Sequence, residues 1–107
     1  MNLEDELTVE LRGTYEAARK RGYVATYFLK MLEEYGGVKT ARRLLSKQEI
    51  QQGLIKLAEL GLLADSMEAV VIKEKYKTLF NVEKDVTDYL AEADRRLREL
   101  GYFEEGK

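Results

Sequence analysis

Apolar residues recur every three or four positions along most of the chain, which is the spacing of one face of an α-helix. The first such stretch covers residues 3–21. Acidic residues crowd its first turn and basic residues its last, the charge order that the helix dipole favours. We therefore expect a long N-terminal helix that ends at Gly22, with a kink or a close helix crossing at Gly13.

An aromatic-rich helix is expected next, over residues 26–35, with Thr26 as its N-cap. Such a stripe could line a ligand pocket, but at helical spacing it is more often core, and we interpret it as core. Gly36 and Gly37 can both adopt the positive φ that ends a helix, so a new short helix should follow over residues 38–45. The apolar stripe of the helix expected over residues 26–35 consists of Tyr27, Phe28, Met31, Leu32 and Tyr35.

The stretch after this short helix carries the clearest local signals. Residues 46–49, Ser-Lys-Gln-Glu, form the pattern of a capping box, in which Ser46 and Glu49 each accept a hydrogen bond from the other's backbone amide. We therefore expect a helix over residues 47–60, closed by Gly61. Because about one residue joins it to the preceding helix, the two should cross steeply in a helix-turn-helix-like corner at Ser46.

The C-terminal half predicts further helices. Ser66 can cap a short helix, although the β-branched run at residues 70–72 leaves a short strand as an alternative there. A helical turn around Tyr76 should follow, and Asn81 is the expected N-cap of a last long helix over residues 82–100.

Together these patterns predict an all-α fold, a compact bundle of five to six helices. The bundle should form one domain over residues 1–107, with residues 103–107 frayed.

Composition narrows the possible functions. The 107 residues include no cysteine and no histidine, which removes disulfides, thiolate and imidazole metal sites, and the commonest general base. The formal net charge of −2 gives no overall attraction to nucleic acid, so DNA binding would need a local basic patch. No stretch is long and apolar enough for a membrane span, and the N-terminus lacks a signal-peptide pattern. We expect a cytoplasmic protein that does not bind membranes.

Catalytic chemistry is not indicated, and we expect neither enzymatic activity nor a cofactor. The best candidate cluster is the acidic triplet Asp85, Asp88 and Glu92, which shares one helix face and could hold a hard cation. No EF-hand spacing or loop glycine accompanies it. We interpret the triplet as an acidic face balanced by nearby arginines.

Residues 46–63, SKQEIQQGLIKLAELGLL, resemble the recognition helix of winged helix-turn-helix regulators. Residues 64–80 contain no hairpin turn signal for the wing, so the resemblance implies a wingless DNA-binding protein. On this hypothesis the glutamines and Lys56 would contact base edges and the other cations phosphates. The alternative is that both helices merely expose polar sides to solvent. The implied DNA-binding residues are Lys39, Arg42, Arg43, Lys47, Gln48, Gln51, Gln52 and Lys56.

A second resemblance covers more of the chain. The order TYFLKMLEEYGGVKTARRLL, GLIKLAELG, SMEAVVI and RRLRELGY is similar to a family of small uncharacterised bacterial proteins. Members tend to carry an aromatic residue, a basic residue and a proline where this chain has Ala58, Leu62 and Glu74. This resemblance implies only a compact helical domain of unknown function, in bacteria or their mobile elements.

By elimination, we expect a non-catalytic protein-interaction module with a protein partner of unknown identity. One version of this hypothesis is a protein encoded on a phage or mobile element that acts on a host protein. The alternative is the wingless helix-turn-helix protein, which a homodimer would favour because half-site readers usually pair.

Overall fold

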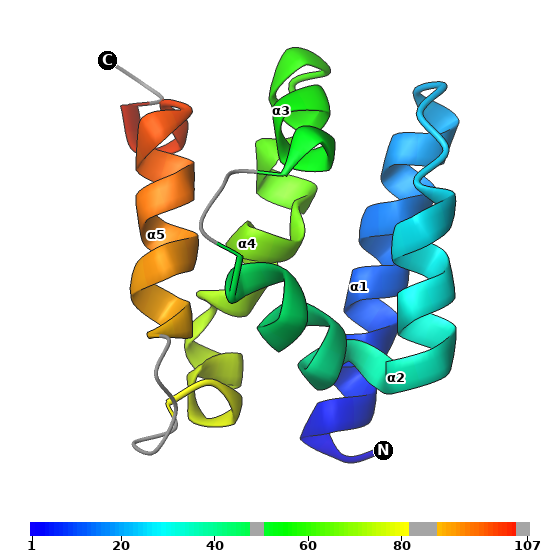
Figure 1. Cartoon of the computed structure of the whole chain (residues 1–107), viewed down its shortest axis with the longest axis vertical. Coiled ribbons are helices and arrows are strands. Elements are labelled where there is room, and N and C mark those ends of the chain that lie inside the picture. Colours follow the sequence, from blue (N-terminus) through cyan, green and yellow to red (C-terminus); the bar gives the residue numbers. More distant parts are fainter. Residues whose placement is uncertain (48–50, 82–87, 105–107) are drawn as a thin grey trace.

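The computed structural model describes residues 1–47, 51–81 and 88–104. Within these ranges the regular structure consists of α-helices and short 3₁₀ helices, and no strand is present. The prediction of an all-α bundle is therefore confirmed (Figure 1).

The first helix, α1, spans Leu3–Lys20 and begins where the Asn2 side chain accepts a hydrogen bond from the Asp5 amide at 2.8 Å. Its inward face buries Leu7 and Leu11 completely. The helix continues without a break through Gly13, and no atom lies within 4 Å of the place a Cβ would take there. The predicted kink or crossing at Gly13 is therefore wrong, because this residue lies on the exposed side of α1.

The second helix, α2, spans Thr26–Leu45 and consists of two halves separated at Gly36, where φ is 79° and ψ is 173°. The predicted break at the glycine pair is confirmed. The first half runs antiparallel to α1, and the second half turns toward the centre of the molecule (Figure 1). Gly37 is buried against α1, and its amide donates a hydrogen bond to Thr8 Oγ1 at 2.8 Å. The close helix crossing therefore lies at Gly37.

The third helix, α3, spans Gln52–Glu59, so the predicted start at Lys47 is wrong. Ser46 is the C-cap of α2, and its hydroxyl donates to the Arg42 carbonyl at 2.7 Å. The Ser46 amide donates to the same carbonyl at 3.0 Å, so both donors of this serine serve the end of α2. Residues 48–50, which include part of the predicted capping box, lie outside the described residues. The expected one-residue corner is replaced by a longer connection between the two helices.

One short 3₁₀ helix precedes the fourth α-helix, and another follows it. The 3₁₀ helix η1 spans Leu63–Asp65, α4 spans Met67–Val71, and η2 spans Glu74–Leu79. Ser66 caps α4 as predicted, since its Oγ accepts a hydrogen bond from the Ala69 amide at 3.1 Å. The strand alternative for this segment is wrong.

The last α-helix, α5, spans Tyr89–Glu99, and its N-cap is Asp88, which accepts from the Ala91 amide at 3.0 Å. The expected cap at Asn81 is therefore wrong, and the predicted helical residues 82–87 lie outside the described residues. Gly101 ends the helix with a φ of 79°, and the 3₁₀ helix η3 spans Tyr102–Glu104. The frayed end predicted for residues 103–107 stays a prediction, because residues 105–107 lie outside the described part.

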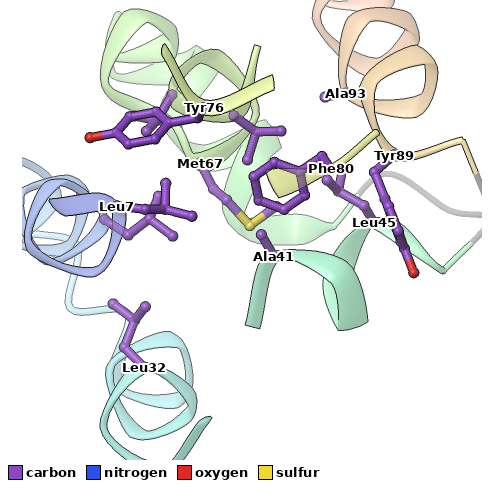
Figure 2. Packing of buried hydrophobic residues seen from close by; sticks show 12 residues of the cluster. Leu7, Leu32, Ala41, Leu45, Met67, Tyr76, Phe80, Tyr89 and Ala93 are labelled. Atoms are coloured by element: carbon purple, nitrogen blue, oxygen red, sulfur yellow. The ribbon is translucent and has the colours of Figure 1, made fainter. Parts of the chain in front are cut away.

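One hydrophobic core joins these elements. Figure 2 shows Met67 pointing between Ala41 of α2 and Phe80, with Leu7 of α1 and Tyr76 of η2 on the opposite side. The buried cluster comprises Leu7, Leu11, Leu32, Ala41, Leu45, Met67, Val70, Val71, Tyr76, Phe80, Tyr89 and Ala93.

A polar contact fixes η2 to α1 at the edge of this core. Glu10 accepts hydrogen bonds from Tyr76 Oη, at 2.7 Å, and from Lys73. Burial alone would raise the pKa of Glu10, but the hydrogen bonds from Lys73 and Tyr76 and the nearby lysine charges lower it below its ordinary value. The carboxylate form is therefore the one that the fold stabilises.

Two glycine-to-alanine substitutions should change stability in opposite directions. In Gly37→Ala the new Cβ would lie 3.0 Å from the Thr8 amide nitrogen, and we expect a loss of about 1–3 kcal/mol from overpacking. In Gly13→Ala the methyl group meets open space within α1, and we expect a gain of about 0.5–1 kcal/mol. Urea unfolding of both variants measures the difference. Equal effects would show that the α1–α2 crossing is not tight at Gly37.

Glu10 should make stability depend on pH in the acidic range. Its pKa is lower in the folded than in the unfolded state, so its contribution exists above the ordinary value of 4.5 and is lost as the pH falls through the folded-state pKa. We expect Glu10→Gln to be less stable than the parent at pH ~7 and to lose less stability on going to pH ~3. Glu34→Gln is the control, because Glu34 is exposed and makes no ion pair within the described residues. If the two variants responded alike to pH, Glu10 would not be the linked group.

Candidate functional site

A groove of about 500 Å³ opens at the end of the molecule where α1 finishes and α2 begins. In Figure 1, α3 lies across from that end, and its residues form the opposite wall. The lining is mostly apolar. The wall from the N-terminal half contains Thr14, Tyr15, Ala18 and residues 23–28; the other wall and the floor contain Gln51, Gln52, Gly53, Leu54, Leu57, Met31, Leu44, Met67 and Glu68.

Two apolar side chains at this groove are open to solvent. Tyr27 is 77% exposed and Val24 is 55% exposed. The prediction that Tyr27 belongs to the core is wrong, because α2 turns Met31 and Leu32 inward and Tyr27 lies at the edge of the stripe. The breadth of that stripe was the available signal, since five large apolar residues cover more than one helix can bury against a single neighbour.

Tyr23 brings the two walls together at one point. Its hydroxyl lies 3.4 Å from the position that a Cβ would take at Gly53. The glycine thus lets the tyrosine ring approach α3 closely, and the remainder of the groove stays open beside this contact.

Two polar side chains in the lining of the groove are buried. Thr14 is only 8% exposed, and its Oγ1 is buried and has no hydrogen-bond partner in the described structure. Glu68 is also buried, but its carboxylate accepts a hydrogen bond from Arg96 at 3.2 Å.

Arg96 connects Glu68 to the rest of the protein. Its side chain is fully buried, and besides Glu68 it donates to Glu92 Oε2 at 2.7 Å. One terminal nitrogen donates to the carbonyl of Leu44 at 3.0 Å and to that of Lys47 at 2.6 Å. A single guanidinium thus joins α5 to α4 and to the C-terminal end of α2.

The pKa values of the two carboxyl groups that pair with Arg96 shift in opposite directions. Burial raises the pKa of Glu68, although Arg96 acts in the opposite direction. Hydrogen bonding from Arg95 lowers the pKa of Glu92, against its partial burial, and Arg96 lowers it further. The ion pair with Arg96 is one of the interactions that favour the charged form of Glu68 against its burial.

The residues predicted to contact DNA divide between two places. Lys39 and Arg43 are exposed on α2 and lie over the Tyr35 ring, at 5.8 Å and 4.2 Å from its centroid. Arg42 is partly buried, and its Nη2 donates to the Leu79 carbonyl at 2.8 Å, so this guanidinium contributes to the fold. Lys47 is exposed at the end of α2.

The other members of the predicted set belong to α3. Gln52 is exposed and Gln51 is partly buried, and both line the groove. Lys56 is exposed and pairs with Glu59 at 3.8 Å, while Gln48 lies outside the described residues. The two glutamines thus border an apolar site, a feature that their amide-rich pattern did not indicate.

Two members of the acidic triplet have other partners in the described structure. Asp88 caps α5, Glu92 binds the arginines, and Asp85 lies outside the described residues. No group of three carboxylates that could hold a metal occurs within residues 1–47, 51–81 and 88–104. Glu92 is thus paired with arginines, while the interpretation of the whole triplet stays a prediction.

No family model, curated protein or solved structure matches the chain. Both resemblances noted in the sequence therefore stay predictions. None of the helices in the described part of the chain is long and apolar enough to cross a membrane.

Removing the buried guanidinium of Arg96 should lower the free energy of unfolding far more than removing that of Arg95. Arg96→Met leaves the buried Glu68 carboxyl without its guanidinium partner and removes the donor that the Leu44 and Lys47 carbonyls share, and we expect a loss of about 3–5 kcal/mol. Arg95→Met is the matched control on the same helix, because Arg95 also binds Glu92 but is 42% exposed, so a loss below about 1 kcal/mol is expected. Free energies of unfolding in urea provide the measurement. Similar losses in the two variants would contradict the role of Arg96.

Proposed function

We propose that this protein is a non-catalytic protein-interaction module that binds an apolar segment of a partner protein in the groove. The observation that carries the proposal is an open, mostly apolar groove with Tyr27 and Val24 exposed at it. Exposed apolar side chains grouped around a concavity are typical of interaction sites, whereas isolated ones are ordinary.

The composition of the lining supports a peptide segment as the occupant. Tyrosine and methionine are enriched at protein interfaces, and the groove has both: Tyr15, Tyr23 and Tyr27, together with Met31 and Met67. Methionine side chains adapt to differently shaped apolar partners. The open form between helices also suits a helical segment that inserts side chains spaced by three or four residues.

The residue types at the groove suit binding. The sequence contains no histidine or cysteine, and among the described lining residues the one carboxylate, Glu68, is paired with Arg96. That the protein is encoded on a phage or mobile element and acts on a host protein stays a hypothesis. On that hypothesis, a segment of the host protein would bind in the groove. DNA binding likewise stays a prediction, and no contact within the described structure favours it.

Two matched valines test the groove directly. Val24 lines the groove and Val9 on α1 does not, yet they are 55% and 57% exposed. We expect Val24→Gln to weaken binding of peptides selected from a random library on the intact protein by about 5- to 30-fold, the effect of losing one useful interface contact. Val9→Gln should leave affinity unchanged. Both variants should keep the parent's melting temperature, because neither valine is buried.

The site of binding is measured by amide chemical-shift changes when the selected peptide is added to labelled protein. Shifts at Tyr27, Gly53 and their neighbours are the expected result. Peptides that shift only residues around Tyr35, or that bind both valine variants equally, would place the interaction elsewhere and overturn the proposal.

A further inference from the structure

We propose that the exposed side of the second half of α2 is a separate docking surface, which binds an acidic helical segment of a partner protein through Arg43. We call this surface the basic face, and its charged residues are Lys39, Arg43 and Lys47. None of the three lines the groove, so the basic face is independent of the proposed function.

The outward side of this half-helix carries only positive charge. No aspartate or glutamate occurs in residues 35–47, and the nearest preceding acids, Glu33 and Glu34, lie before the break at Gly36. The three cations of the basic face form no ion pair within the described residues. Its electrostatic complement is therefore an acidic segment. The exposed residues among 37–47 are Lys39, Arg43, Ser46 and Lys47.

An aromatic ring supports the guanidinium of Arg43. Its Cζ lies 4.2 Å from the centroid of the Tyr35 ring, which belongs to the first half of α2. A guanidinium that stacks on a ring uses its flat face and leaves its N–H groups open in its own plane. The N–H groups of Arg43 donate to no acceptor within the described residues. They can therefore bind a carboxylate through two parallel hydrogen bonds.

The other two cations extend this site along the helix. Lys39 precedes Arg43 by four residues, and its Nζ lies 5.8 Å from the centroid of the same Tyr35 ring. Lys47 follows Arg43 by four residues, directly after the C-cap of α2. Four residues rise about 6 Å along a helix, so glutamates four residues apart on a partner helix have a matching spacing. The basic face thus fits a helix with glutamates at every fourth position.

Three available cations suit a short acidic segment better than a nucleic acid. Arg42, the fourth cation of this stretch, is partly buried and donates to the Leu79 carbonyl. A protein that binds DNA tightly through its backbone contacts on the order of 6–10 phosphates. The net charge of −2 also disfavours a long polyanion, which would extend past the basic face over the rest of the molecule.

Two synthetic peptides of identical composition provide the test. In the first, three glutamates lie four residues apart on one face of an alanine-rich helix. In the second, the same glutamates are distributed around the helix. Amide chemical shifts of the labelled intact protein give both the binding site and the affinity. We expect the first peptide to shift residues 35–47, to bind about 3- to 10-fold more tightly than the second, and to bind more weakly as salt is added.

Arg43→Gln should weaken binding of the first peptide by about 3- to 10-fold, because the bidentate contact is lost. Arg98→Gln is the matched control, since it removes the same charge. Arg98 also lies over a ring, 5.0 Å from the centroid of Phe103, but it already donates to Asp94 at 2.6 Å. This control should leave the affinity unchanged. Equal effects of the two substitutions would overturn the role of Arg43.

The ring beneath the guanidinium is tested separately. Tyr35→Phe keeps the ring and should bind the first peptide like the parent. Tyr35→Leu removes the ring and should weaken binding, because Arg43 is no longer oriented. Melting temperatures confirm that both variants are folded under the conditions of the titration. An unchanged affinity in Tyr35→Leu would show that the ring does not prepare Arg43 for a carboxylate.

Three further outcomes overturn the basic face as a protein-docking surface. In one, neither peptide shifts residues 35–47. In another, the first peptide shifts Tyr27 and Gly53 at the groove instead. In the third, a random-sequence DNA duplex or inorganic phosphate shifts residues 35–47 at lower concentrations than the first peptide does. Binding of the library peptides in the groove is measured independently, so neither surface depends on the outcome for the other.

Discussion

The fold depends on a guanidinium in its interior. Arg96 is fully buried, and its nitrogens bind a carboxylate on α4, a carboxylate on α5 and two carbonyls at the end of α2. Burying a charge is unfavourable unless nearly every polar atom around it is satisfied, so these partners must stay in place together. The carbonyls of Leu44 and Lys47 thereby obtain a donor from outside α2. Three segments distant in the sequence are thus fixed at one point.

This arrangement explains why a groove can exist beside a small core. Arg96 and Glu68 fix α4 below the groove, and Ser46 ends α2 so that the chain continues toward α3. Leu54 and Leu57 bury the inner side of α3, while Tyr27 and Val24 on the facing wall remain exposed. A chain of 107 residues buries a smaller share of its surface than a larger domain does, and part of its apolar surface therefore stays exposed.

Charged side chains occur in two different settings. In the interior, acids and arginines are paired closely, and this pairing stabilises one arrangement of α2, α4 and α5. By contrast, Lys20, Arg21 and Lys30 face solvent and have no ion pair in the described ranges. Exposed charges of this kind add little to stability. The same residue types therefore support the fold where they are buried and paired, and contribute little to it at the surface.

The sequence by itself determined the helical class, the break at Gly36, the Ser66 cap and the helix end at Gly101, because periodicity and glycine conformation act over a few neighbouring residues. It did not reveal whether Ser46 would cap the following helix or end the preceding one, because its hydroxyl can pair with either. The groove was also beyond local patterns. Tyr27 and Leu32 belong to one apolar stripe, and only the packing of α1 and α3 around α2 decided which is buried and which is exposed to solvent. Arg96 resembles its neighbours in sequence, and its role arises from contacts with residues 28 and 52 positions away, which no short-range signal encodes.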